Sequence, residues 1–328
     1  MKPASFAIIA LLSCLPLAAK NLGDMKCGPA VTELLAGRLT LRLPPEARIK
    51  AMSHGLMSAP ASQAEETRAV VDAGPQRMVI MAYELFSLAS DDVERRISEQ
   101  FKRNGEKIRL RPWELPSGLK AYAFFPESAT RDEVANLVMG VYLIRSDQTI
   151  QQVAIYVNPE GAQASAKASI LAGAICATLA EGKRSLNQAS GERELMAVSP
   201  QKSMLVTVPN GYVTTRQDGP DFRVYHIRKL VMFGEEAMSI GVYLGDYPSG
   251  QTGYTRRETG RLFEREIEWS EEMANENGES SIDDDAIVPL AYPGLPSYAD
   301  VFLHAGDVAG MQELKTTAAT LRIGDPKR

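Results

Sequence analysis

The chain has 328 residues, of which 45% are hydrophobic and 23% are charged, and its formal net charge at pH 7 is −5. This length and apolar share are enough for the cores of two ordinary domains, and they exclude a disordered chain. The mildly acidic balance gives no broad basic field, which argues against binding to nucleic acid or to an anionic membrane surface. We therefore expect the partner to be a protein or a small molecule.

The N-terminus predicts export. Lys2 is followed by an apolar run at residues 6–17 and then by the small residues Ala18 and Ala19. These are the three parts of a secretory signal peptide, which we place at residues 1–19. The apolar run at residues 6–17 is too short for a membrane-spanning helix, which needs roughly 20 apolar residues, and no later segment comes closer to that length. We expect a periplasmic protein without an integral membrane segment.

Cys14 leaves a second interpretation of the N-terminus open, in which this cysteine is lipidated. A leucine precedes Ser13 at the position where lipoprotein signals usually carry a small residue. The mature N-terminus is therefore expected to be free, with an acylated Cys14 as the alternative.

Two cysteines remain after cleavage, Cys27 and Cys176. In an oxidising compartment an even number of cysteines favours a disulfide. Cys27 precedes the first predicted strand, and Cys176 lies on the helix that closes the first half. We expect a disulfide that fastens the N-terminal segment to that helix, with two unpaired thiols as the alternative.

The first half predicts one hairpin, two helices and further strands. Asp91 and Glu94 have the spacing of a capping box and start a helix that ends at Asn104 and Gly105. A longer, alanine-rich helix begins near Gly161 and carries an apolar stripe of helical period. A surface loop that includes at most one weak strand is expected at residues 51–66. The strands are expected at 39–43, 68–72, 77–85, 108–115, 119–125, 138–144 and 152–157.

The second half follows a similar plan after a polar linker at residues 181–194. This linker sets the domains at 20–184 and 193–328. A loop at 246–259 replaces the capped helix of the first half, and a mobile acidic loop is expected at 273–285. The remaining elements are strands at 204–208, 221–231, 238–244, 260–268, 287–290 and 298–304, and a closing helix at 308–323.

Both halves open on a strand broken by proline and end with a strand followed by a helix. We therefore predict a duplicated α+β fold, in which each domain is an antiparallel sheet packed by helices. With its breaks at residues 43–46 and 208–211, this order resembles the Mog1/PsbP/DcrB-like group of small α+β domains over most of the chain. The resemblance implies a role in binding or assembly without an active site.

A second resemblance concerns the exported two-domain layout, with Cys27 shortly before the segment at residues 37–44. This layout looks like the periplasmic immunity proteins that neutralise type VI secretion lipase effectors. In such proteins two domains grip the toxin and cover its lid or active-site entrance. The resemblance implies a toxin as the partner and carries over no individual contact residue.

Residues with catalytic or metal-binding potential are few. The three histidines, His54, His226 and His304, do not stand at the spacing of metal ligands. The chain also contains no G-x-S-x-G elbow, phosphate-binding loop or dinucleotide-binding glycine motif. We expect a protein that is not an enzyme and has no cofactor and no metal.

Five acidic residues form a cluster in the second half. Asp283, Asp284 and Asp285 follow Glu276 and Glu279. Carboxylates could bind calcium, but the spacing is not that of a calcium-binding loop. A solvated loop that meets a basic partner surface is the preferred interpretation, because opposite charges speed association.

Aromatic residues concentrate in the second half. Tyr247, Tyr254 and Tyr292 lie in loops rich in proline and glycine, where tyrosine is typical of interface anchors. The other aromatic residues divide between interface and sheet core, and they are Tyr243, Tyr298, Phe263 and Trp269.

Export, duplication and the lack of catalytic motifs together favour a protein that binds another protein. The most specific hypothesis is a periplasmic immunity protein that binds and neutralises a secreted toxin through the loops at 246–259 and 273–296. One alternative is an envelope assembly or maintenance factor of the DcrB kind. A second alternative is a hydrolase with an unrecognised site.

Overall fold

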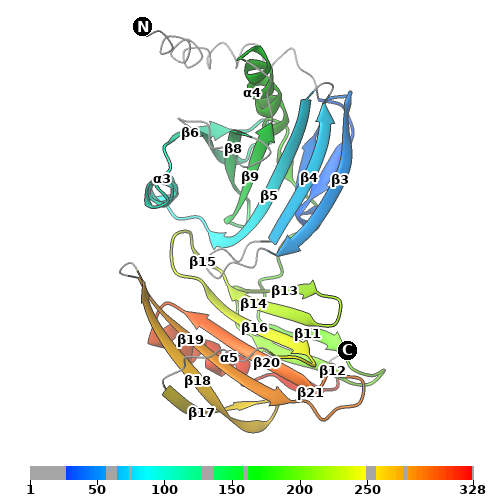
Figure 1. Cartoon of the computed structure of the whole chain (residues 1–328), viewed down its shortest axis with the longest axis vertical. Helices are drawn as coiled ribbons and strands as arrows, with labels where there is room; N and C mark the ends of the chain where they lie inside the picture. The colour runs from blue at the N-terminus through cyan, green and yellow to red at the C-terminus, as the bar shows by residue number, and fades with distance from the viewer. Residues whose placement is uncertain are drawn as a thin grey trace. The chain divides into compact units, whose positions relative to one another are not determined.

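The computed structural model describes residues 27–56, 65–73, 76–126, 136–157, 162–248, 256–276 and 279–326. The chain divides into two compact units, residues 1–185 and residues 186–328 (Figure 1). In the described residues, each unit has one large antiparallel sheet, one small antiparallel sheet and an α-helix that contacts both sheets.

The large sheet of the first unit has the strand order β3-β4-β5-β9-β8-β7-β6, and its small sheet has the order β1-β2-β10. Helix α4 (Ala162–Cys176) contacts β8 of the large sheet and β2 of the small sheet. The 3-10 turn η1 (Leu35–Gly37) connects the first two strands. The strands are β1 (Val31–Leu34), β2 (Leu39–Arg42), β3 (Ala47–Leu56), β4 (Glu65–Ala73), β5 (Gln76–Leu88), β6 (Ile108–Glu114), β7 (Lys120–Pro126), β8 (Asn136–Ile144), β9 (Thr149–Val157) and β10 (Ala180–Glu181).

The large sheet of the second unit has the strand order β13-β14-β16-β20-β19-β18-β17, and its small sheet has the order β11-β12-β21. Helix α5 (Val308–Ala318) contacts β16 and β20 of the large sheet and β12 of the small sheet. The strands are β11 (Gly191–Ala197), β12 (Ser203–Val208), β13 (Tyr212–Asp218), β14 (Arg223–Lys229), β15 (Val231–Met232), β16 (Met238–Gly245), β17 (Arg256–Leu262), β18 (Arg265–Glu276), β19 (Glu279–Pro289), β20 (Tyr298–Ala305) and β21 (Arg322–Gly324).

The two units repeat one topology. In each large sheet, the first three strands in chain order are followed by the last strand and then by the other three in reverse. In each small sheet, an opening hairpin pairs with the short strand that follows the closing helix. Each unit also has its own core, formed by inward-facing residues of the two sheets and one face of the helix. Alternation along each strand leaves a second face of the large sheet, opposite α4 or α5, which we call the outer face.

In the first unit, helix α3 (Val93–Arg103) covers part of the outer face. The ring of Phe101 on α3 lies 5.0 Å from the ring of Phe124 and 6.3 Å from that of Tyr142. Phe124 needs Gly140 beneath it, because a Cβ at that glycine would lie 1.9 Å from the ring. The predicted capping box does not form: the helix begins after Asp92, whose side chain makes no cap hydrogen bond.

A buried polar cluster extends the core layer of the first unit. Glu84 on β5 is fully buried, and its carboxylate accepts hydrogen bonds from Arg38 Nε at 3.2 Å and from Gln151 Nε2 at 2.7 Å. Arg38 also forms an ion pair with Glu65 on the neighbouring strand. Burial raises the pKa of Glu84, while Arg38 opposes that shift. These contacts tie the segment after η1 to three strands of the large sheet.

The predicted α+β class is wrong. Strands account for 56% of the described residues and helices for 14%, so the fold is mostly β and the helices do not form a layer of their own. Of the loop expected at 51–66, the described residues 51–56 and 65–66 belong to β3 and β4, and most of the acidic loop expected at 273–285 is β18 and β19. The expected linker at 181–194 ends inside β11.

The sequence does not predict these strands because polar residues occupy some of the positions that face the core. On β19, Asp284 stands in the same alternation as Ile282, Ala286 and Val288, and all four are buried. Strand formation depends more on neighbours across the sheet than on the residue's own preference. The alternation of apolar and polar residues that predicts a strand is therefore interrupted where an inward position carries a charge.

Candidate protein-binding surface

The outer face of the second large sheet differs from that of the first at one connection. In the first unit, α3 lies in the connection between β5 and β6. The corresponding connection of the second unit, between β16 and β17, is residues 246–255, of which only 246–248 lie within the described part. This connection carries Tyr247 and also Tyr254, which lies outside the described residues. No helix of the described residues therefore takes the place of α3 in the second unit.

Tyr243 and Tyr247 lie at the end of β16 and just after it, Tyr298 begins β20, and Tyr292 is in the segment that leads to β20; we call these four residues the tyrosine surface. Tyr247 is 81% exposed, Tyr292 38% and Tyr298 37%. Two hydrogen bonds connect the segments that carry them. The Tyr243 hydroxyl donates to the Tyr247 carbonyl at 3.2 Å, and the Ser297 N–H donates to Asp246 Oδ1 at 2.8 Å.

Tyr243 is the fixed member of the tyrosine surface. Its ring stacks on Phe222, with centroids 5.6 Å apart and an angle of 30° between the rings. It also lies over Gly245, where a Cβ would come within 2.2 Å of the tyrosine hydroxyl. Tyr298 stands directly across from this glycine in the ladder between β16 and β20. A ring held in this way loses little further conformational freedom when a partner binds.

The three consecutive aspartates do not form a loop. They lie on β19, paired in register with β18 and β20, and alternate between the two faces of the sheet. Asp284 is 1% exposed and pairs with Lys315 on α5, whereas Asp285 is 7% exposed. Asp283 is half-buried and accepts a hydrogen bond from His304. The upstream glutamates fall on the same hairpin, Glu276 in β18 and Glu279 in β19.

The histidines are separate from one another in the structure. On β20, His304 donates from Nδ1 to Asp283 Oδ1 at 2.8 Å and from Nε2 to Glu236 Oε1 at 2.9 Å, and these hydrogen bonds raise its pKa to about 8. Burial, with help from Arg228, lowers the pKa of His226 on β14 to about 3. His54 on β3 hydrogen bonds to Thr67. Across the described ranges, no three acidic, histidine or cysteine side chains are grouped as metal ligands would be.

The expected disulfide is absent, because Cys27 and Cys176 are free thiols. The Cys27 thiol donates a weak hydrogen bond to the carbonyl of Ala174, at 3.7 Å, near the end of α4. Carbonyls in the last turn of a helix have no partner within the helix. Cys176 is fully buried in the core of the first unit. Cys27 therefore lies beside the last turn of α4, whereas Cys176, the last residue of that helix, faces the core.

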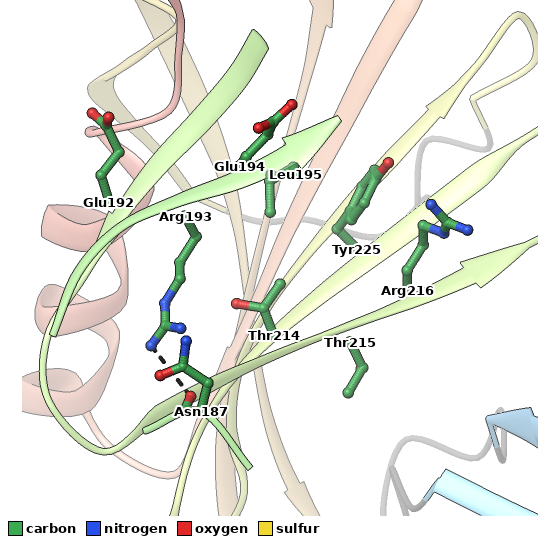
Figure 2. A pocket seen from close by; sticks show the side chains of 9 residues that line it. All are labelled: Asn187, Glu192, Arg193, Glu194, Leu195, Thr214, Thr215, Arg216 and Tyr225. Atoms are coloured by element: carbon green, nitrogen blue, oxygen red, sulfur yellow. Dashed lines mark hydrogen bonds between the residues drawn. The ribbon is translucent and has the colours of Figure 1, made fainter. Parts of the chain in front are cut away.

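A hollow of ≈ 400 Å³ lies within the second unit, between β11 of the small sheet and β13 and β14 of the large sheet (Figure 2). We call it the β11–β13 hollow. Sequence reasoning did not identify it, because its two sides meet only in the folded unit. The nine residues that line it are Asn187, Glu192, Arg193, Glu194, Leu195, Thr214, Thr215, Arg216 and Tyr225.

No protein-family model and no curated protein matches the chain. Among solved structures, the chain is weakly similar to the immunity protein TplEi of the type VI secretion system of Pseudomonas aeruginosa, in complex with the "L" peptide. The identity is 9%, the match covers 89% of this chain and 96% of that one, and the TM-score is 0.25. The chain is also weakly similar to MucB in complex with MucA(peri), at 11% identity over 98% of this chain and 100% of that one, with a TM-score of 0.18.

Similarities at this level do not establish a shared fold, and the Mog1/PsbP-like resemblance is not among them. In the part of the chain that the structure describes, no helix is long and apolar enough to cross a bilayer. Among the described residues of the second unit, two features could contact a partner: a surface with exposed tyrosines and a polar hollow.

Proposed function

We propose that the protein is an exported binding protein and that its partner contacts the tyrosine surface of the second unit. The observation that carries this proposal is the exposure of Tyr247, 81%, beside a neighbouring ring that is already fixed by stacking. Tyrosine combines a large apolar ring with a hydroxyl and has few torsions to immobilise, so it is common among residues that dominate binding energy.

The position of the tyrosine surface supports the same proposal. In the first unit, α3 buries Phe124 and Tyr142 on the outer face. In the second unit, Tyr247 is on the connection that replaces this helix, and Tyr298 and Ile287 on the outer face are 37% and 40% exposed. Exposed apolar groups that lie close together are typical of protein interaction sites.

We further propose that the partner is a secreted toxin, a lipase effector of a type VI secretion system, and that the chain is a periplasmic immunity protein. The export pattern at residues 1–19 and the layout around residues 37–44 support this choice. Neutralisation then requires no chemistry from this chain, because a bound protein that covers an active-site entrance excludes the substrate.

Periplasmic co-expression with the product of the neighbouring gene, which the proposal expects to be a lipase, tests it. The native chain is expected to restore growth and to bind the purified lipase with a Kd below micromolar. Replacing Tyr247 and Tyr292 by alanine should raise Kd by about 30-fold or more, which corresponds to the loss of one or more strong interface residues. Val308→Ala is the matched control, because Val308 is 71% exposed and lies at the start of α5.

The two levels of the proposal fail in different ways. If the native chain forms no complex with the lipase below micromolar, the immunity role is wrong. If the complex forms but both tyrosine substitutions leave its Kd unchanged, the immunity role stands and the tyrosine surface is not the interface.

A further inference from the structure

The β11–β13 hollow lies between two sheet edges. In the order of each sheet, β11 and β13 are terminal strands, and among the described residues β11 pairs only with β12 and β13 only with β14. Terminal strands have backbone N–H and C=O groups on one side that take part in no ladder. An extended chain can add to such an edge as a further strand.

Two buried hydroxyl groups border the hollow and have no hydrogen-bond partner in the described part of the chain. Tyr225 is 2% exposed, and neither its hydroxyl nor that of Thr214 has a partner among the described residues. Figure 2 shows both side chains on the β13 and β14 side, with Arg193 and Glu194 on the β11 side. Buried polar groups are almost always paired, and an unpaired one costs free energy. These hydroxyls are therefore positioned to accept or donate hydrogen bonds to a bound molecule.

Among the described residues, the charges around the hollow leave one cation without a counterion. Glu192 forms an ion pair with Arg322, and Glu194 accepts a hydrogen bond from Ser203 at 2.8 Å. Arg216 forms an ion pair with Asp218 at 3.0 Å.

Arg193 is the exception. Its guanidinium donates to the backbone carbonyls of Asn187 and Ala189, and no described carboxylate lies within ion-pair distance of it. Figure 2 marks the contact with Asn187. Burial lowers the pKa of Arg193. A ligand carboxylate would complete its charge-assisted hydrogen bonds.

We propose that the β11–β13 hollow binds an extended peptide segment that carries an acidic side chain. The peptide backbone adds along an open strand edge, its carboxylate pairs with Arg193, and the hydroxyls of Tyr225 and Thr214 complete its hydrogen bonds. Open strand edges select an extended backbone, and the uncompensated guanidinium selects an acid. This site is separate from the tyrosine surface, and different observations carry it.

The test uses the full chain and a positional-scanning library of decapeptides that are acetylated and amidated, so that no terminal carboxylate is present. Binding is followed by fluorescence anisotropy. We expect a preference for aspartate or glutamate at one position, and loss of binding when the peptide bonds flanking that position are N-methylated. Arg193→Gln should weaken binding of the selected peptide by about 10- to 100-fold, the range for a lost charge-assisted hydrogen bond.

Two control variants separate this proposal from its alternatives. Arg216→Gln changes an arginine of the same hollow that already has a counterion, and it should alter Kd by less than about twofold. The variant with alanine at both Tyr247 and Tyr292 should bind the peptide as the native chain does, so failure here is distinct from failure of the tyrosine surface. Tyr225→Phe should weaken peptide binding while the unfolding midpoint of the free protein stays the same or rises.

Three results would overturn the proposal. The first is that no library position gives binding below millimolar. The second is an acidic preference that persists in Arg193→Gln, and the third is equal binding of the N-methylated peptide.

Discussion

Lys315 of α5 forms an ion pair with Asp284 of β19 inside the second unit, with 2.7 Å between Nζ and Oδ2. The two side chains are 9% and 0% exposed. Burial opposes the charge on Lys315, but hydrogen bonds with Asp284 and Glu258 overcome this effect and raise its pKa. An aspartate expected from the sequence to meet a partner therefore holds the closing helix on its sheet.

Breaking this pair should destabilise the protein strongly. Lys315→Met leaves Asp284 buried without its cation, which typically costs about 3–5 kcal/mol. The measurement is the free energy of unfolding in urea at pH 7. Arg257→Met is the control, because its ion pair with Glu268 is 75% and 63% exposed and such pairs contribute about 0–1 kcal/mol.

The double variant Lys315→Met with Asp284→Val removes both charges. It should recover most of the loss, since replacing a buried ion pair by apolar groups is often neutral. A loss below about 1 kcal/mol in the single variant would contradict the role assigned to the pair.

His304 should make stability fall at alkaline pH. Its hydrogen bond with Asp283 and that with Glu236 raise its pKa from 6.5 to about 8. A base with a raised pKa in the folded state contributes fully below pH 6.5, and this contribution is lost as pH rises through about 8. The shift corresponds to on the order of 2 kcal/mol.

The check is the unfolding free energy of the native chain and of His304→Gln between pH 6 and pH 9.5. The difference between them should narrow by on the order of 2 kcal/mol over this range. A difference that stays constant would show that the charge of His304 makes no contribution.

Asp300 should produce a second pH dependence over a lower range. Burial, followed by the hydrogen bond with Asp285 and the charge of Asp285, raises the pKa of Asp300 from 3.8 to about 8. An acid with a raised pKa takes up a proton on folding. The contribution of Asp300 to stability is therefore complete below pH 3.8 and is lost as pH rises through about 8.

Between pH 5 and pH 7, this one group should lower the free energy of unfolding by about 1.4 kcal/mol per pH unit. Asp300→Asn keeps the shape and removes the titration, so its slope over that range should be smaller by the same amount. Equal slopes in the native chain and in Asp300→Asn would mean that the carboxyl ionises freely in the folded state.

The two thiols should differ in reactivity. Burial raises the pKa of Cys27 and of Cys176, but Cys27 is half-buried and Cys176 is fully buried. Only the thiolate reacts with a disulfide reagent. At pH 8, we expect slow labelling of Cys27 in the native protein and labelling of Cys176 only after unfolding. If neither thiol of the unfolded, unreduced mature chain reacts, the two form a disulfide after all.

Regular apolar alternation made some elements predictable. The expected strands at 238–244 and 298–304 correspond closely to β16 and β20, and the helix expected at 308–323 begins with α5. In these segments the inward positions are almost all apolar, so sequence period and packing agree. The sequence of β19 lacks this agreement, because the inward Asp284 is acceptable only with Lys315 opposite it.

The candidate sites divide in the same way. The exposure of Tyr247 follows from its place beside a proline in a connection, and its part in binding stays a prediction. The β11–β13 hollow combines Arg193 with Thr214 and Tyr225, which are close only because two sheet edges meet. No local pattern marks Tyr225, since its ring follows ordinary strand alternation and only the unpaired hydroxyl distinguishes it.

The small sheet of each unit cannot be completed until the end of that unit has been synthesised. In both, the hairpin made first completes its sheet only with the strand that follows the closing helix: β10 at Ala180–Glu181 pairs with β2, and β21 at Arg322–Gly324 pairs with β12. During synthesis or translocation from the N-terminus, the small sheet of each unit therefore stays incomplete until its last strand is available. Contacts this distant in sequence slow folding, so each half passes through a stage in which a chaperone or a protease can reach its unclosed core.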